Sequence, residues 1–451
     1  MKAFDPRVLA DFARSYGFHY DICDPRTMVQ DALLDMERGL AGKSSPMPMI
    51  PSYLRPITEV PLGKTVVALD AGGTNLRAAR VSFREAGKPE TTGLTKIPMP
   101  GTKGRVGAEE FFDRIAEITA PLLEGGGDIA GIGFCFSYPM RMKEDGDGLL
   151  ISLSKEVDAP EVPGMVIGDS LKQALKRRGA RVPERVVLLN DTVAALLSGL
   201  AEIRPDCGRI RGADTFGAPP GPVVGFILGT GFNTAYPEKF IPKINFNSPE
   251  SPMIVVCESG TGAPRYLGIL DREFDATTKN PGVFTMEKAA AGAYLGPLTF
   301  HILKRAIDEG VVRFRRSGEF AALPCLQTRE LNEFMHSPLS RDGPIGSLFD
   351  RDELDSVRAF VYLVSIVTQR GAYLAAAVVA AAVERMDAGF DPFSPVRIAV
   401  EGTTYVMYRG VREALESALH IMLNREKPRS YFITPVEQAS LFGAAVAGLS
   451  K

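Results

Sequence analysis

The sequence lacks the paired cysteines and spaced histidines from which disulfide frameworks and zinc sites are built. Its five cysteines, at positions 23, 135, 207, 257 and 325, lie far apart and include no CxxC pair. An odd, scattered set of this kind is typical of reduced thiols in a reducing compartment. The four histidines show no zinc-type spacing either. We therefore expect a cytoplasmic protein with neither structural disulfides nor zinc.

An excess of charge of one sign is also missing. The chain has 52 Lys and Arg residues against 54 Asp and Glu residues, for a net charge of −2, whereas nucleic-acid-binding proteins usually carry a basic excess. The longest uncharged stretch, 216–237, contains four prolines and five glycines, so it cannot form one membrane-crossing helix. Asp5 and Asp11 interrupt what would be the apolar run of a signal peptide. We expect neither a nucleic-acid partner nor a membrane partner.

Several common nucleotide and catalytic motifs do not occur. The sequence contains no GxGxxG fingerprint and no GxSxG elbow. Gly42-Lys-Ser44 resembles the end of a Walker A loop, but Glu37 stands where that motif needs its first glycine, and a predicted helix precedes the segment instead of a strand. The sequence therefore gives no support to a P-loop, a Rossmann or an α/β-hydrolase site.

The length and hydrophobic content predict a globular protein of two or three domains. The chain has 451 residues, of which 45% are hydrophobic, enough for a large core. Periodicity predicts helical structure in the first 40 residues and helices over 108–123, 170–178, 192–203, 285–309, 352–386 and 412–423. It predicts strands over 65–69, 76–83, 129–136, 185–189, 223–228, 253–257 and 396–400. Alternation of strands with helices predicts an α/β architecture with mixed sheets.

Two segments repeat the same pattern of an apolar strand, a glycine turn and a second strand. They begin near residues 65 and 223 and suggest two related halves. In the first, Asp70-Ala-Gly-Gly-Thr-Asn75 could form an anion nest of backbone N–H groups with Thr74 as a further donor, and Asp70 could hold Mg²⁺ through water. The same residues would also make an ordinary hairpin turn. The second turn, Gly229-Thr-Gly231, favours the nest, because two nests can hold successive phosphates of one nucleotide.

Carboxylates follow or begin several of these predicted elements. Asp191 comes just after a buried strand, where open α/β sheets bind ligands, although by itself Asn190-Asp-Thr192 more strongly indicates a helix cap. Glu258 ends a strand, and Glu287 lies in the first turn of a helix, where the helix dipole favours it in any case. Ser154-Lys155 lies in a polar loop, where a lysine is usually just solvated. None of these residues is decisive by itself.

Taken in order, five segments resemble the motifs of the hexokinase family. They are Leu69-Asp-Ala-Gly-Gly-Thr-Asn-Leu-Arg77, Phe134-Cys-Phe-Ser-Tyr-Pro139, Leu189-Asn-Asp-Thr-Val193, Gly229-Thr-Gly-Phe-Asn-Thr-Ala-Tyr236 and Met286-Glu-Lys-Ala-Ala-Ala-Gly-Ala-Tyr-Leu-Gly296. The resemblance runs from about Met36-Glu-Arg-Gly-Leu40 to the C-terminus. It implies a two-lobed actin-like (ribonuclease H-like) ATPase fold, in which mixed sheets flanked by helices close over a sugar and ATP.

The resemblance also implies domain boundaries and an activity. Residues 1–55 would form a helical segment packed on the large lobe, residues 56–189 with 437–451 the small lobe, and residues 190–436 the large lobe. The activity would be ATP-dependent phosphorylation of a hexose, glucose above all, at its 6-hydroxyl, which is the first step of glycolysis.

Each proposed role is carried over from the matching motif. Asp191 would be the general base, with Lys155 as a second catalytic residue. The sugar would be bound by Ser137, Ser154, Lys155, Asn190, Asp191, Asn233, Glu258 and Glu287. The phosphates of Mg-ATP would be held by Asp70, Gly72, Gly73, Thr74, Asn75, Arg77, Gly229 and Thr230, with Thr328 and Thr403 as further candidates on the nucleotide side and Asp70 holding Mg²⁺ through water.

Three segments depart from the family pattern. Val256-Cys-Glu-Ser-Gly260 replaces Asn-Thr-Glu-Trp-Gly, Leu153-Ser-Lys155 replaces Trp-Thr-Lys, and Ala439-Ser-Leu-Phe-Gly443 replaces a Gly-Ser-Gly-Lys-Gly loop near the adenosine. The catalytic groups are retained, so the departures bear on sugar preference and nucleotide choice more than on the type of reaction. Two alternatives stay open: a sugar-binding regulator that has lost turnover, and a kinase of another small molecule with the same fold.

Overall fold

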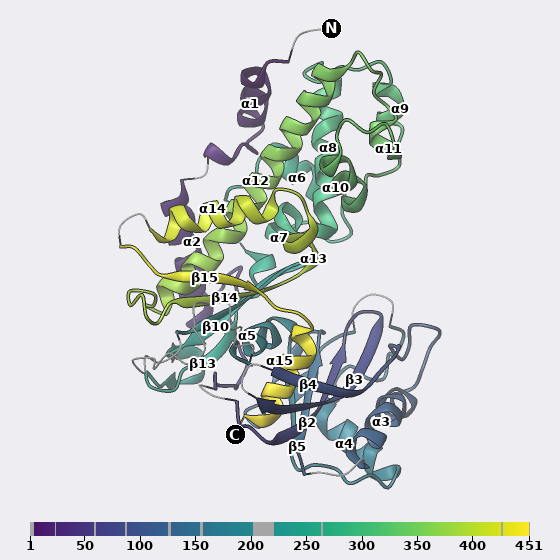
Figure 1. Ribbon diagram of the computed structural model, residues 1–451, viewed down its shortest axis with the longest axis vertical. Helices are drawn as coiled ribbons and strands as arrows, with labels where there is room; N and C mark the ends of the chain where they lie inside the picture. Colours follow the sequence, from purple (N-terminus) through teal and green to yellow (C-terminus); the bar gives the residue numbers. More distant parts are fainter. Residues whose placement is uncertain are drawn as a thin grey trace.

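The computed structural model describes residues 4–22, 24–57, 60–85, 88–124, 128–153, 157–201, 221–262, 265–424 and 427–450, with only the backbone at positions 85 and 88. Two β-sheets form the centres of two lobes, which lie one above the other in Figure 1. The smaller, lower lobe contains residues from the first half of the chain, and the C-terminal helix packs against it. This agrees with the α/β, two-lobed architecture that the sequence predicts.

The small lobe is built on a five-stranded sheet with the order β4-β3-β2-β5-β8. Its strands are β2 (Lys64–Ala71), β3 (Asn75–Glu85), β4 (Lys88–Pro98), β5 (Ile129–Phe136) and β8 (Val186–Leu189). β2 and β3 form the predicted antiparallel hairpin, whereas β5 and β8 run parallel to β2. Helices α3 (Ala108–Glu124) and α4 (Ile167–Arg177) pack together against this sheet, and the short strands β6 (Met140–Met142) and β7 (Gly148–Leu150) pair beside it.

The large lobe repeats this strand order. Its sheet runs β1-β13-β10-β9-β14-β15, with β1 (Ile50–Pro51), β9 (Val223–Leu228), β10 (Phe232–Glu238), β13 (Met253–Val256), β14 (Val396–Glu401) and β15 (Tyr431–Pro435). β9 and β10 form an antiparallel hairpin, and β14 and β15 run parallel to β9. Apart from the added edge strand β1, the two sheets have the same topology, as the two related halves of the sequence predict.

Two equivalent helices connect the lobes. α5 (Asp191–Ala201) follows the last strand of the small sheet and packs on β9 and β14, whereas α15 (Ala439–Leu449) follows the last strand of the large sheet and packs on β2 and β5. The two helices pack directly against each other near the centre of Figure 1. Residues 439–443, which the family resemblance places in a loop, form the first turn of α15.

The contact between α5 and α15 depends on glycine. A Cβ atom at Gly443 would lie 2.1 Å from the carbonyl oxygen of Ala194, so the helices could not keep their present distance. We therefore expect Gly443→Ala to destabilise the protein by about 1–3 kcal/mol, although alanine is normally the better helix former. Thermal or urea unfolding would measure this. Gly318→Ala in helix α9 (Ser317–Ala321) is the matched control, because nothing lies within 4 Å of that added Cβ; equal stability of the two variants would contradict the prediction.

The core of the large lobe surrounds one long helix, α12 (Leu354–Arg385). It is packed by α2 (Pro25–Leu40), α14 (Val411–Leu423), α8 (Gly292–Asp308) and α1 (Pro6–Ser15). Its length and hydropathy would suit a membrane span, but 89% of its most apolar window is buried inside the protein. The remaining elements are α6 (Ile269–Ala276), α7 (Thr285–Ala290), α9 (Ser317–Ala321), α10 (Thr328–His336), α11 (Gly343–Gly346), α13 (Thr403–Met407), β11 (Phe240–Ile241), β12 (Phe246–Asn247) and the 3₁₀ turns η1 (Tyr20–Ile22), η2 (Pro242–Ile244) and η3 (Ser259–Thr261).

One predicted helix is wrong in its extent. The periodicity predicts a single helix over 285–309, but the structure breaks it into α7 and α8 at Ala291, whose backbone is extended. The N–H groups of Gly292 and Ala293 donate to the carbonyl oxygens of Gly229 and Thr230, at 2.8 and 3.1 Å. These bonds to a distant turn replace the intrahelical bonds that would continue the helix.

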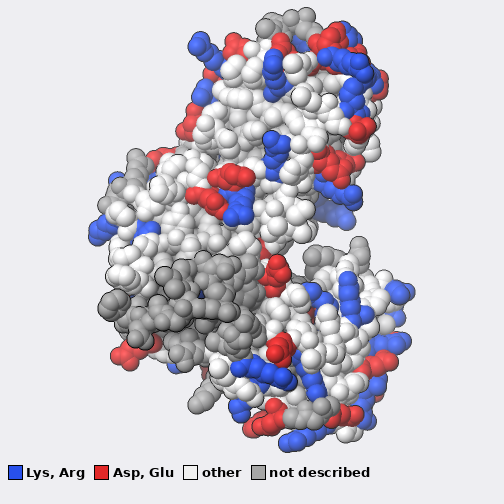
Figure 2. All heavy atoms as spheres, in the orientation of Figure 1, with Lys and Arg blue, Asp and Glu red and all other residues white. Residues whose placement is uncertain are grey.

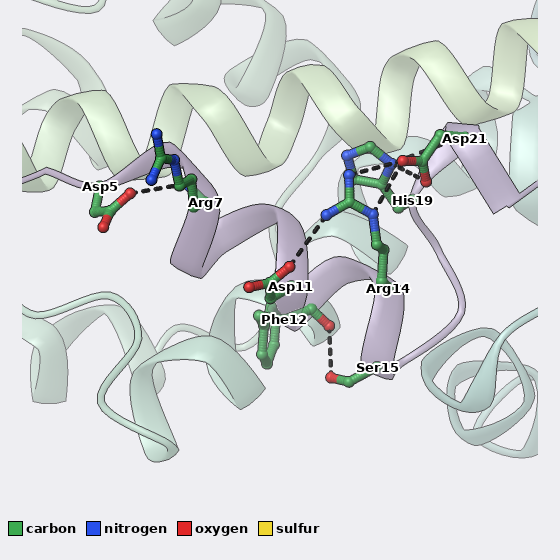
Figure 3. A network of polar contacts seen from close by, with 8 residues as sticks. All are labelled: Asp5, Arg7, Asp11, Phe12, Arg14, Ser15, His19 and Asp21. Carbon is green, nitrogen blue, oxygen red and sulfur yellow. Dashed lines mark hydrogen bonds and ion pairs between the residues drawn. The ribbon is translucent and has the colours of Figure 1, made fainter.

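The N-terminal segment is fastened by a polar network (Figure 3). Arg14 on α1 reaches Asp11 in the same helix and Asp21 in η1, and His19 Nδ1 lies 2.5 Å from Asp21 Oδ1. The backbone of Tyr16 then accepts a hydrogen bond of 2.8 Å from the N–H of Ile269 at the start of α6. This segment therefore packs on the large lobe, while the exact domain boundaries at 55, 189 and 436 stay a prediction.

Candidate functional site

The first glycine turn joins β2 to β3, and Asp70 lies just before it. Asp70 is only 5% exposed, and Arg77 faces it directly across the hairpin. Arg77 donates to Asp70 Oδ2 from Nε at 2.7 Å and from Nη2 at 2.5 Å. Desolvation by burial raises the pKa of Asp70, while Arg77 and a hydrogen bond from Ser440 lower it. The carboxylate is therefore fixed in position at the edge of the turn.

The turn itself differs from the predicted nest. Neither Gly72 nor Gly73 adopts the left-handed backbone, and the Gly72 N–H donates to the Asn75 carbonyl at 3.0 Å, as in an ordinary hairpin. The hydroxyl group of Thr74, which the sequence suggests as a donor to an anion, accepts a 2.8 Å hydrogen bond from the Asn75 side chain. A Cβ at Gly72 would nevertheless meet only the Asn75 oxygen, at 3.8 Å. Local packing therefore does not require glycine here, and the open space suits the close approach of a ligand.

The second glycine turn joins β9 to β10 and is hydrogen-bonded to two helices, α8 and α13. The carbonyl oxygen of Gly229 accepts hydrogen bonds of 2.8 Å from the Gly292 N–H and from the Thr404 hydroxyl group. Gly231 has a packing reason to be glycine, because a Cβ there would lie 2.9 Å from Glu287 Oε2. Thr230, between these glycines, is exposed.

Glu258 lies at the end of β13 in a left-handed conformation, with φ of 56°. Asn233 Nδ2 donates to Glu258 Oε1 at 3.0 Å, and the oxygen of the same carboxamide accepts from the Ser259 N–H at 3.2 Å. Desolvation raises the pKa of Glu258 to about 7; the negative charges of Asp191 and Glu287 add to the rise, and the Asn233 bond opposes it. The three carboxyl groups therefore lie close enough to interact.

Asp191 and Glu287 each begin a helix. Asn190 caps α5 by accepting from the Val193 N–H at 2.9 Å, so the predicted cap is confirmed and is made by the asparagine. The neighbouring Asp191 is half-buried and accepts a 3.2 Å bond from the Thr192 hydroxyl group. Glu287 Oε2 accepts from the Phe232 N–H at 3.2 Å, which connects α7 to the second glycine turn.

The sequence reasoning missed one carboxylate, Glu401. It is the last residue of β14, and desolvation raises its pKa to about 7, with repulsion from Asp191 and then Asp70 adding to the rise and Arg77 opposing it. Glu401 therefore interacts with both Asp70, the acid of the first hairpin, and Asp191. The signal was present in the sequence, because Glu401 ends a buried strand just before Gly402, much as Asp70 lies near the end of a buried strand two residues before Gly72.

Five acids are thus linked by pairwise electrostatic interactions and are called here the row of acids. Glu401 interacts with Asp70 and Asp191, and Glu258 interacts with Asp191 and Glu287. They lie at or just after the ends of strands of both sheets, or in the first turns of helices α5 and α7, next to the two glycine turns.

Figure 2 shows a cleft between the lobes, with acidic side chains where the lobes meet. Within the described residues, no group of three or more His, Cys, Asp or Glu side chains could hold a metal ion by itself. An acid-lined cleft of this kind suits a polyhydroxyl ligand better than an apolar one.

Comparison with known families decides the assignment. Two family models, both described as hexokinase, match residues 223–450 and residues 16–201. The chain belongs to the hexokinase family. It is a sugar kinase of the hexokinase type, as the motif order in the sequence predicts.

Curated hexokinases match most of the chain. Hexokinase-1 of Schizosaccharomyces pombe is 28% identical over 431 residues, covering 91% of this chain and 84% of the relative. Hexokinase-2 of Oryza sativa is 28% identical over 443 residues, covering 93% and 86%. Among solved structures, a Schistosoma mansoni hexokinase complexed with glucose superposes with a TM-score of 0.73 at 24% identity, covering 99% of this chain and 100% of that one. A second hexokinase crystal structure has a TM-score of 0.76 at 22% identity, covering 98% and 99%. The two structures support the predicted actin-like fold.

Some residues expected from the hexokinase resemblance lie outside this row. Ser154 and Lys155 fall outside the described residues. The Ser137 N–H donates to the Ala71 carbonyl at 3.1 Å, which places Ser137 beside the first glycine turn. Thr328 Oγ1 accepts a 2.8 Å bond from the Gly296 N–H and so connects α10 to α8, whereas Thr403 is exposed at the start of α13. Their roles toward sugar or nucleotide stay predictions.

Replacing Glu401 by glutamine will flatten the pH dependence of stability. The pKa of Glu401 is about 7 in the folded protein, against an ordinary value of 4.5, so between these pH values the folded state holds a proton that the unfolded state has released. The carboxyl group therefore makes the unfolding free energy fall as the pH rises from about 4.5 to about 7. We expect Glu401→Gln to match the wild type at pH 5 and to exceed it at pH 8 by on the order of 1–3 kcal/mol. Urea unfolding of the ligand-free proteins tests this, and an equal difference at both pH values would contradict it.

Proposed function

We propose that this chain transfers the terminal phosphoryl group of ATP to the 6-hydroxyl of a hexose, with glucose as the leading substrate and Asp191 as the general base. The observation that carries the proposal is the position of Asp191 in the row of acids. It interacts with both Glu258 and Glu401, and Glu401 interacts in turn with Asp70 beside the first glycine turn. An acid so placed can face a sugar and a phosphate at the same time.

The sugar would be held by carboxylates and amides of the large lobe. Glu258 and Glu287 offer acceptors for sugar hydroxyl groups, and Asn233 offers a carboxamide whose oxygen is fixed by Ser259. Paired acceptors of this kind can meet the adjacent hydroxyls of a hexose bidentately. The pKa of Glu258 is about 7, so its carboxyl group is only partly ionised near that pH. A sugar hydroxyl that donates a hydrogen bond to it would stabilise its ionised form.

The phosphates would lie against the two glycine turns. The open space beside Gly72 admits close approach, and exposed Thr230 offers a hydroxyl donor at the second turn. Asp70 would hold Mg²⁺ through water, which fits a carboxylate already occupied by Arg77 and Ser440, because this ion keeps several waters. When bound, the ion would neutralise charge on the phosphates during transfer.

In the chemical step Asp191 would accept the proton of the 6-hydroxyl as the oxygen attacks phosphorus. General-base catalysis of this type contributes roughly 10²–10⁴-fold, while alignment and charge neutralisation supply the rest. Closure of the lobes about α5 and α15 would exclude water, which would otherwise compete with the sugar as acceptor. We place the reaction in the cytoplasm, since Cys135, Cys257 and Cys325 are free thiols.

A substrate panel tests the proposal. ADP release is measured with ATP and Mg²⁺ in the presence of glucose, other hexoses, glycerol or no acceptor, and the site of phosphorylation is read from the product by NMR. Glucose 6-phosphate as the main product supports the proposal. Glucose binding without any sugar phosphate would instead support the regulator, and turnover only with a non-hexose acceptor would support another kinase of this fold.

A further inference from the structure

Glu258, the acid expected to bind the sugar, has a backbone conformation that its neighbours must hold in place. Its φ of 56° lies in the left-handed region, which costs free energy for a residue with a side chain. The carbonyl oxygen of Glu258 accepts two hydrogen bonds from one residue, Thr261: from its N–H at 3.1 Å and from its hydroxyl group at 2.6 Å. Thr261 therefore restricts the rotation of the Glu258 backbone.

The same hydroxyl group connects Glu258 to a distant part of the chain, segment 46–49. The Thr261 hydroxyl group also donates to the carbonyl oxygen of Pro46, so one donor serves two carbonyl groups that are far apart in sequence. Segment 46–49 leads directly into β1, which pairs with β13 as far as Val256, two residues before Glu258. The segment thus lies beside the strand end that positions the sugar-binding acid.

Segment 46–49 is held in place by contacts of its own. The half-buried Lys243 donates from Nζ to the carbonyl oxygens of Pro48 and Met49, each at 2.6 Å. The side chain of Met49 is fully buried in the core of the large lobe. Because these contacts do not involve Thr261, the carbonyl group of Pro46 is a fixed acceptor on which the threonine hydroxyl group can be oriented.

We propose that Thr261 is a positioning residue for sugar binding: its hydroxyl group holds Glu258 in the conformation that presents the carboxylate to the sugar, with segment 46–49 as the fixed support. This inference rests on the proposed function, because it takes Glu258 as a sugar ligand. Valine has nearly the shape of threonine but no hydroxyl group. We expect Thr261→Val to raise the Kd and KM for glucose about tenfold and to change kcat less than about threefold, because Asp191 is not touched.

Two variants separate this hydrogen bond from the loss of a hydroxyl group in general. Thr261→Ser keeps the donor and should bind glucose with nearly the affinity of the wild type. Thr277→Val removes a bond of the same kind at the end of α6, where the Thr277 hydroxyl group donates at 2.7 Å to the Phe274 carbonyl three residues earlier. Because no expected sugar ligand lies there, its Kd for glucose should equal that of the wild type. Circular dichroism and thermal unfolding show whether each variant is folded.

A double-variant cycle tests whether Thr261 acts through Glu258. The Kd of glucose is measured by NMR titration, which reaches weak affinities, for the wild type, Thr261→Val, Glu258→Ala and the double variant. Thr261→Val should weaken binding about tenfold in the wild type but less than about threefold once the Glu258 carboxylate is absent. The same factor in both backgrounds, or wild-type affinity in Thr261→Val, would overturn the positioning role alone. A wild type that binds no sugar would refute the proposed function and the positioning role with it.

Discussion

Replacing Asp191 by asparagine will lower kcat for sugar phosphorylation by about 10²–10⁴-fold. Asparagine keeps the size of the side chain but cannot accept the hydroxyl proton. The helix should be unaffected, because Asn190 and not Asp191 caps α5. Since the sugar is expected to be held mainly by Glu258, Glu287 and Asn233, its Kd should change by only a few-fold. Steady-state kinetics together with calorimetric titration of glucose would measure both quantities.

The contrasting variant is Glu258→Gln. Its carboxylate is expected to bind the sugar and not to take the proton, so this change should raise KM and Kd together, with a smaller effect on kcat. The two variants therefore separate binding from the chemical step. A value of kcat in Asp191→Asn close to that of the wild type, with the folded state intact by circular dichroism, would refute the assignment of the base.

Replacing Arg370 by methionine will cost about 3–5 kcal/mol of unfolding free energy. Arg370 is fully buried in α12 and pairs with the buried Asp271, donating from Nη2 to Oδ1 at 2.7 Å and from Nη1 to Oδ2. Asp271 in turn accepts from the Gly268 N–H at 2.7 Å, which fixes the start of α6 where the N-terminal segment is attached. The large effect arises because the change leaves one charge buried without its partner.

A double variant tests this reason. In Arg370→Met/Asp271→Asn the unpaired charge is gone while an acceptor for Gly268 remains, so part of the lost stability should return. Arg329→Met is the control for an exposed pair: Arg329 contacts Glu333 in α10 with both side chains largely in solvent, and its loss should cost under about 1 kcal/mol. A loss in Arg370→Met no larger than that of Arg329→Met would contradict the prediction.

The sequence predicted the acids that follow a simple local pattern. Asp70 and Asp191 both come at the ends of apolar strands, and Glu258 does so as well, so their positions at one edge of the sheets follow from topology. Glu401 has a similar pattern, but it lies in none of the five family-like segments, so the sequence alone does not single it out. Its significance depends on nearness to Asp191 and Asp70, which only the packing of the lobes determines.

Other features were beyond local reasoning. The break at Ala291 depends on the hydrogen bond from the Gly292 N–H to the distant Gly229 carbonyl. Helical periodicity in the sequence does not indicate such a long-range partner. Glutamate rarely adopts a left-handed backbone, so residue preferences do not predict the left-handed conformation of Glu258. The adjacent glycines at 72 and 73 allowed either a nest or an ordinary hairpin turn, and the hydrogen bond from the Gly72 N–H to the Asn75 carbonyl shows the hairpin turn. At Ala291 a tertiary contact overrides the local preference.

The carbonyl group of Gly229 has a consequence for how the two substrates influence each other. It receives bonds from the start of α8, which follows the helix of Glu287, and from Thr404 in α13, which follows Glu401. A displacement of this single peptide would shift the segments of Glu287 and Glu401 at once. We therefore expect synergy: sugar binding should tighten nucleotide binding, and Thr404→Val should weaken that mutual enhancement more than it weakens either ligand bound alone.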